Sequence, residues 1–254
     1  MVVGERPCNH TLSSFYVASL GFHSPATIAM GTIQAALDSV VAGLSDQSYT
    51  ESLAFYRIWL DIGQTYQQIP ADQTFDAIWN NRGVGSAINP AGGGFVHSRA
   101  HLIVRFASDV ESDYIPHMSG LQSRLCMKTL QEFFSNNMMS IQWVANCWGA
   151  MNVFYQDTNL IARWANLGYV EEAAIRNHIL QSLISHSKLW DHQADALIIL
   201  FKLAGPTFAA YADPSVVDRC FELLKDHYVH NPVKKELAQV RTAYPATCSR
   251  LPSG

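Results

Sequence analysis

The run Ala-Asp-Ala-Leu-Ile-Ile-Leu-Phe-Lys-Leu-Ala, residues 194–204, decides the fold. It is apolar at all but two positions and does not alternate, so it predicts a helix that neighbours enclose on most sides. The segment that begins at Pro214 has a different pattern, in which apolar residues recur at steps of three and four: Val217, Cys220, Phe221, Leu224 and Tyr228. This second pattern predicts a helix with one buried face.

Residue pairs that start helices mark further elements. Ser24-Pro25, Asp213-Pro214 and Asn231-Pro232 each place a side-chain acceptor at the N-cap and a proline in the first turn. Ser48 followed by Glu51 has the pattern of a capping box. Together with the apolar spacing, these signals predict helices over residues 25–43, 48–67, 71–81, 95–113, 117–136, 139–165, 170–186, 189–204, 214–228 and 232–241.

The fold class predicted from these elements is all-α. No stretch combines β-branched residues, two-residue alternation and hairpin turns, so no strand is expected. The helices are expected to stack, either as a solenoid or as an irregular bundle. One domain is predicted over residues 1–254, and the glycine-rich residues 80–94 are the point at which a subdivision is considered.

The composition excludes some classes of protein. Of the 254 residues 48% are apolar and 15% charged, the net charge is -4, and lysine and arginine form no run. Nucleic-acid binding is therefore not expected, because it needs a surface that neutralises phosphates. Residues 133–156 carry no charge and could reach across a bilayer, but their amides and hydroxyls favour a buried protein helix, so the chain is not predicted to be transmembrane.

The cysteines and the N-terminus indicate a cytoplasmic protein. The five cysteines are an odd number, are widely spaced and form no Cys-x-x-Cys pair, which is typical of a reducing compartment. Glu5 and Arg6 stand where a secretory signal would have a basic start followed by an apolar core.

Two segments 41 residues apart share a pattern. Ile179, Leu180, Leu183 and His186 are matched by Cys220, Phe221, Leu224 and His227. With a period near 40 residues, the chain resembles armadillo and HEAT repeats over about residues 130–241. The resemblance implies stacked helices that bind another protein. A bundle without repeats stays the alternative, because all helices share a 3.6-residue period.

The middle of the chain is rich in aromatic residues. Aromatic residues at helical spacing usually form core, but rings with a few amides also wall many ligand pockets. The residues that would line such a pocket, for a small apolar ligand, are Trp143, Trp148, Trp164, Asn146 and Asn152.

His97 and His101 are the candidate metal ligands. They stand four residues apart on an expected helix, so both imidazoles leave the same face, as two ligands of a transition metal do. A polar helix face or hydrogen-bonded core histidines explain the same spacing. The sequence identifies no other cofactor.

His186, His192 and Asp195 are the candidate catalytic residues. His192 and Asp195 stand one turn apart at the start of the apolar 194–204 helix, where a carboxylate could orient an imidazole as a base. Capping of a buried helix start, with the carboxylate favoured by the helix dipole, is the other interpretation.

The glycines between residues 83 and 94 precede an expected helix and could present backbone N–H groups to a phosphate. The ending of a P-loop is absent and no strand precedes the segment, so a surface loop or a lid is the other interpretation. Arg82, Arg99 and Arg105 would be the anion partners.

Two functions follow from the sequence. The first is a protein-interaction or scaffold module that binds another protein through a helical face. The second is an all-α enzyme or small-molecule-binding protein that uses the aromatic middle of the chain, with a histidine-bound metal as one option. The oligomeric state and the identity of any partner are left open.

Overall fold

The computed structural model describes residues 30–65, 71–84, 98–114, 117–138 and 148–227. The helices in this part of the chain confirm the all-α prediction, and no strand occurs among the described residues. None of the described helices is long and apolar enough to cross a membrane. The chain divides into two compact units, Met1–Asn80 and Asn81–Gly254, and the division falls at the start of the glycine-rich residues 80–94.

The first unit contains α2 (Met30–Ala42), α3 (Tyr49–Thr65) and α4 (Ala71–Asn81). Helix α2 packs against α3. Helix α3 begins one residue after Ser48, as its sequence predicts, and the Ser48 hydroxyl donates a hydrogen bond to the Gly43 carbonyl oxygen (2.9 Å). The buried Tyr56 hydroxyl donates to the Thr74 hydroxyl (2.5 Å), which joins α3 to α4.

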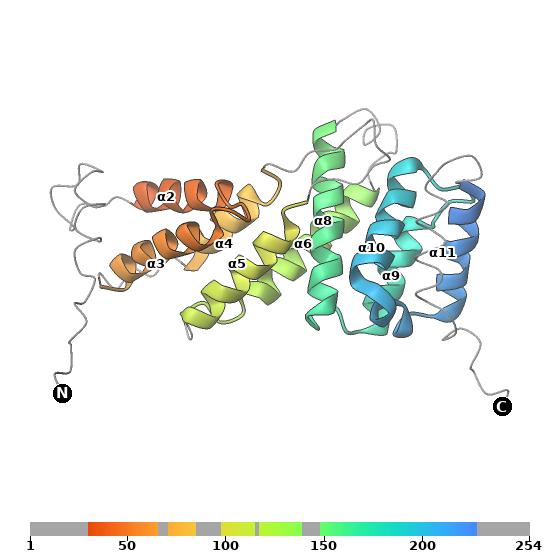
Figure 1. Ribbon diagram of the computed structural model, residues 1–254. Helices are drawn as coiled ribbons and strands as arrows, with labels where there is room; N and C mark the ends of the chain where they lie inside the picture. Colours follow the sequence, from red (N-terminus) through yellow and green to blue (C-terminus); the bar gives the residue numbers. More distant parts are fainter. Residues whose placement is uncertain (1–29, 66–70, 85–97, 115–116, 139–147, 228–254) are drawn as a thin grey trace, which may run out of the picture. The chain divides into compact units, whose positions relative to one another are not determined.

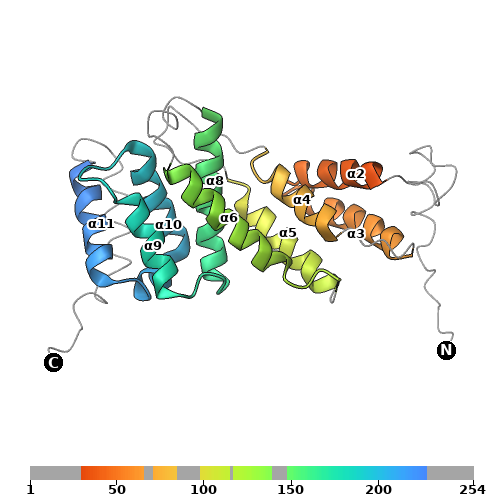
Figure 2. The same cartoon turned by 180° about the vertical axis from the view of Figure 1, so that it is seen from behind.

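The second unit contains six of the described helices. They are α5 (Ala100–Asp113), α6 (Leu121–Met138), α8 (Trp148–Asn166), α9 (Ala173–Leu183), α10 (Asp191–Ala210) and α11 (Pro214–His227). Helix α8 packs against α5, α6 and α10, whereas α9 packs against α6, α10 and α11. The helices of this unit therefore fall into one row of α5, α8 and α10 and a second row of α6, α9 and α11, which Figures 1 and 2 show from opposite sides.

Helix α8 and the apolar centre of α10 are less exposed than the helices of the second row. Between residues 152 and 165 of α8 no described side chain is exposed, and the apolar residues 196–201 of α10 are all buried, as their sequence predicts. Each helix of the second row has an exposed stripe with helical spacing. On α6 the stripe includes Arg124, Met127 and Gln131, and α11 buries the predicted face of Val217, Cys220, Phe221 and Leu224 while it exposes the opposite one.

Local signals fix several helix ends. Asp213 caps α11, because its Oδ1 accepts hydrogen bonds from the Ser215 backbone N–H and hydroxyl, both at 2.8 Å. The predicted end of the 189–204 helix corresponds to a break inside α10, where Gly205 takes a positive φ of 66° and the helix continues beyond it. The predicted starts at 95 and 117 are too early. Helix α5 begins at Ala100, and α6 begins at Leu121, after Gly120 with a φ of 79°.

The 41-residue pattern has a structural counterpart. Helices α9 and α11 begin at Ala173 and Pro214, and these starts are 41 positions apart (214 minus 173). The matched residues Ile179, Leu180 and Leu183 are buried, and so are Cys220, Phe221 and Leu224. The two helices thus use equivalent positions for the core. The predicted starts at Ser24-Pro25 and Asn231-Pro232 lie outside the described residues.

Candidate functional site

The most unusual feature of the second unit is a run of four polar residues in the interior of α8. Gln156, Asp157, Thr158 and Asn159 are all buried, although the helix is enclosed by α5, α6 and α10. Buried polar groups need hydrogen-bond partners to offset the loss of water. Two of these residues find them within the helix, since the Thr158 hydroxyl donates to the Phe154 carbonyl and the Asn159 amide to the Tyr155 carbonyl, both at 2.8 Å.

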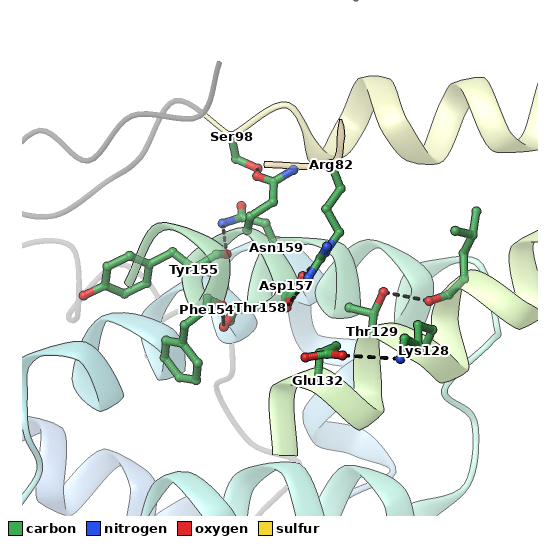
Figure 3. Close-up of polar contacts among 12 residues, drawn as sticks. Arg82, Ser98, Lys128, Thr129, Glu132, Phe154, Tyr155, Asp157, Thr158 and Asn159 are labelled. Carbon is green, nitrogen blue, oxygen red and sulfur yellow. Dashed lines mark hydrogen bonds and ion pairs between the residues drawn. The ribbon is translucent and has the colours of Figure 1, made fainter. Parts of the chain in front are cut away.

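Asp157 forms a buried ion pair with Arg82 (Figure 3). Arg82 Nε lies 2.8 Å from Asp157 Oδ1, and Arg82 Nη2 donates to Asp157 Oδ2 at 3.4 Å, so the guanidinium meets both carboxylate oxygens. The Asp157 side chain is 0% exposed and the Arg82 side chain 13%. This two-point geometry is the arrangement by which arginine compensates a carboxylate that has lost its water.

Gln156 provides a second attachment beside the ion pair. The Ser98 hydroxyl, just before α5, donates to Gln156 Oε1 at 2.8 Å, and the Ala100 backbone N–H donates to the Ser98 hydroxyl oxygen at 3.1 Å. Arg99 Nη1 donates to the Val84 carbonyl oxygen. Arg82 and Ser98, on either side of residues 85–97, are thereby bonded to the neighbouring residues Asp157 and Gln156 of α8. Their own neighbours, Arg99 and Val84, are bonded to each other.

Burial changes the acidity of Asp157. It raises the pKa of this carboxyl from 3.8 to about 6, although the hydrogen bond and the positive charge of Arg82 both lower it. Glu132 of α6 raises it further, and its carboxylate lies 3.4 Å from Lys128 Nζ (Figure 3). A carboxyl with a pKa in this range can gain a proton within the ordinary range of cellular pH.

The three candidate catalytic residues lie at the start of α10 and just before it. His192 is buried with its ring edge-on to Phe154 at 5.7 Å, and burial lowers the pKa of its imidazole. Asp195 Oδ2 accepts a hydrogen bond from the Tyr155 hydroxyl of α8 (3.0 Å). His186 is exposed. The structure thus places Asp195 with a tyrosine hydroxyl, and the catalytic role of the three residues stays a prediction.

The start of α10 is stabilised by another residue. The Trp190 backbone N–H donates to Gln193 Oε1 at 3.2 Å, as a residue in the first turn of a helix does in a capping box. Gln193 therefore already caps the start of α10, which is the role that the capping interpretation gives to Asp195.

The candidate pocket residues are spread along α8. Trp164 is fully buried and packs edge-on against Tyr169 at 5.6 Å. Asn152 lies twelve positions earlier on the same helix, and twelve residues of helix span about 18 Å. A ligand that touched both side chains would have to extend along this length of α8, and the pocket stays a prediction. Trp143 and Asn146 lie outside the described residues, as does the side chain of Trp148.

The structure describes only one of the two candidate metal ligands. His101 lies on α5 and is partly buried, whereas His97 falls outside the described residues. No group of three or more His, Cys, Asp or Glu side chains suited to a metal occurs in the part of the chain that the structure describes. Cys126 and Cys220 are free and buried, and burial raises the pKa of both thiols to about 12.

The arginines proposed as anion partners have other roles. Arg82 pairs with Asp157, and Arg105 lies on the exposed face of α5 with its Nε 3.9 Å from Asp109 Oδ2. Sequence reasoning missed the Arg82–Asp157 pair. The available signal was the polar run 156–159, which directly follows the aromatic Phe154 and Tyr155 inside a helical pattern.

Comparison with known proteins adds no family to this description. No family model, curated protein or solved structure matches the chain.

Proposed function

We propose that this chain is a helical interaction module, whose second unit binds another protein through the exposed row of α6, α9 and α11. The observation that carries the proposal is the difference between the enclosed helix α8 and the helices of the exposed row. Helix α8 has no described side chain exposed between residues 152 and 165, whereas each helix of the exposed row presents a stripe of solvent-accessible side chains. The 41-residue offset of α9 and α11 supports it, because stacked units of one type give an extended binding face.

The exposed row has the composition of a moderate-affinity binding face. Met127 on α6 is 51% exposed, and two turns further along the same helix the Phe134 ring lies 4.5 Å from the ring of His178 on α9. An exposed methionine adapts to partners of different shape, and a ring pair supplies a rigid contact. Charged residues of both signs also lie on this row, and they include the ion pairs Lys128–Glu132 on α6 and Arg219–Glu222 on α11.

The test compares two surface variants of the full chain. Met127→Glu places a charge on the exposed row, whereas Lys202→Glu changes an exposed position of α10 in the other row. Immobilised wild-type chain and the Lys202→Glu control should capture the same protein from an extract, and Met127→Glu should lose it. The captured protein is then purified and its affinity measured, with an expected loss on the order of tenfold or more for Met127→Glu. Equal affinity for all three chains would contradict the proposal.

A second candidate is a small-molecule-binding protein. It is favoured by Asn152 Oδ1 and Trp164 Nε1, which are buried and have no hydrogen-bond partner among the described residues. Such atoms usually bond to a water or a ligand. Native mass spectrometry of the purified chain separates the candidates: a bound small molecule that Asn152→Ala or Trp164→Phe releases would favour the second.

A further inference from the structure

Two hydrogen-bonded contacts meet at residues 156 and 157 of α8, and a third joins Arg99 to Val84. Arg82, which precedes residues 85–97, donates a hydrogen bond to Asp157. Ser98, which follows them, donates to Gln156. Arg99 donates to the Val84 carbonyl oxygen. The Asp157 carboxylate is fully buried, so its charge depends on the guanidinium of Arg82, which contacts it. We refer to Arg82, Ser98, Gln156 and Asp157 as the α8 latch.

The charges around the latch come from each helix that packs on α8. Helix α6 contributes Glu132 and Lys128, which lie 3.4 Å apart. From α10 come His192, against Phe154, and Asp195, which bonds to Tyr155. Beside α5 lies Arg99, bound to the Val84 carbonyl. Arg82 is the cation that touches Asp157 in the described part of the chain, so the charge of Asp157 is compensated mainly by that one contact.

A proton on Asp157 would weaken this contact. The carboxylate accepts from two nitrogens of Arg82, and a neutral carboxylic acid loses the charge-assisted part of both hydrogen bonds. Because Arg82 lowers the pKa of Asp157, the carboxyl binds a proton more tightly once Arg82 has moved away. By linkage, proton binding then favours the state in which Arg82 is released.

We infer that the α8 latch is a proton-operated switch, in which protonation of Asp157 breaks its contact with Arg82 and loosens the chain at residues 82–84 and 98–100 while the surrounding helices stay folded. The raised pKa of Asp157, about 6, supports this inference: the carboxyl would be about 3% protonated at pH 7.5 and about 90% at pH 5. The Arg82 side chain is 13% exposed, so part of it already reaches solvent.

The test measures amide hydrogen exchange of the full chain at pH 5 and pH 7.5, corrected for the intrinsic effect of pH. The reporters are the Val84 amide, which donates to the Asn81 carbonyl, and the Ala100 amide, which donates to Ser98. At pH 5 both should exchange on the order of tenfold faster, whereas amides in the buried centre of α10 should not exchange faster. Uniform acceleration over all helices, or no acceleration at the two reporters, would overturn the inference.

Two variants make the test specific. Asp157→Asn should give fast exchange at Val84 and Ala100 at both pH values, because it is neutral throughout. Asp109→Asn removes the acid of an exposed Arg–Asp pair and should behave like wild type. An Asp157→Asn chain that folds with slow exchange and keeps a pH response would overturn the inference.

A carboxyl titration keeps the inference testable if Asp157→Asn does not fold. In the wild-type chain labelled with ¹³C-aspartate, the Asp157 carboxyl should titrate near pH 6, and in Arg82→Met its midpoint should move upward. A wild-type midpoint below about 4.5 would overturn the switch, as would an unchanged midpoint in Arg82→Met.

Discussion

Arg82–Asp157 and Arg105–Asp109 join the same two residue types in opposite surroundings. The first pair has side chains 13% and 0% exposed at 2.8 Å, and the second has side chains 64% and 37% exposed at 3.9 Å. Water solvates the exposed pair in the folded and the unfolded chain, so its net effect on stability is small. The buried pair has lost that water, so each charge depends on the other. Burial, and not residue type, decides which pair anchors the fold.

Removal of the buried acid should have the largest effect. Asp157→Ala leaves Arg82 with a charge in a site that is almost closed to water, so the free energy of unfolding should fall by about 3–5 kcal/mol. Asp109→Ala should change it by less than about 1 kcal/mol. Denaturant unfolding at pH 7.5 measures both. Similar losses for the two variants would mean that burial does not distinguish the pairs.

The pH dependence should be the next largest effect. Burial raises the pKa of Asp157 in the folded chain above its unfolded value, from 3.8 to about 6. The folded state therefore holds the proton more tightly, and the resulting stabilisation is fully present below pH 3.8 and is lost as the pH rises through about 6. The rise from 3.8 to about 6 corresponds to about 3 kcal/mol.

The measurement for this prediction is the difference in unfolding free energy between wild type and Asp157→Asn across pH 4 to 7.5. As the pH rises, the free energy of unfolding of the wild type should fall relative to that of Asp157→Asn, because only the wild type gains a buried negative charge. The same difference for Asp109→Asn should show no comparable step near pH 6. If the difference between wild type and Asp157→Asn did not change with pH, the raised pKa of Asp157 would be contradicted.

Tyr155→Phe should have a smaller effect. This change removes the hydroxyl that donates to Asp195 Oδ2 at 3.0 Å and leaves the ring in place. Loss of one such hydrogen bond should lower the free energy of unfolding by about 1–2 kcal/mol. Thermal or denaturant unfolding measures it. An unchanged free energy of unfolding would contradict the prediction.

The sequence predicts helices best where the signal is local. The cap at Asp213 involves atoms only two residues apart, so the start of α11 at Pro214 is predicted correctly. The start of α5 is predicted five residues early, because Ser98 bonds to Gln156 of α8, which is 58 positions away. A prediction from apolar spacing extends a helix as far as the pattern continues. In the folded chain, a hydrogen bond to a distant residue can set the helix end closer.

The candidate site is hardest to predict for the same reason. Arg82 and Asp157 are 75 positions apart, and no pattern in the sequence joins them. The sequence singled out Arg82 as an anion partner, but the anion that it meets is an aspartate of the chain itself. His192 and Asp195 share a helical face by spacing, yet Asp195 bonds to Tyr155 because α8 and α10 pack together.

The central claim is that Arg82 and Asp157 depend on each other because both are buried, and a double-mutant cycle tests it most directly. We expect Arg82→Met and Asp157→Leu each to cost several kcal/mol at pH 7.5, and the double variant to lie within about 1 kcal/mol of wild type or above it. If the two losses simply add in the double variant, the residues act independently and the claim is wrong.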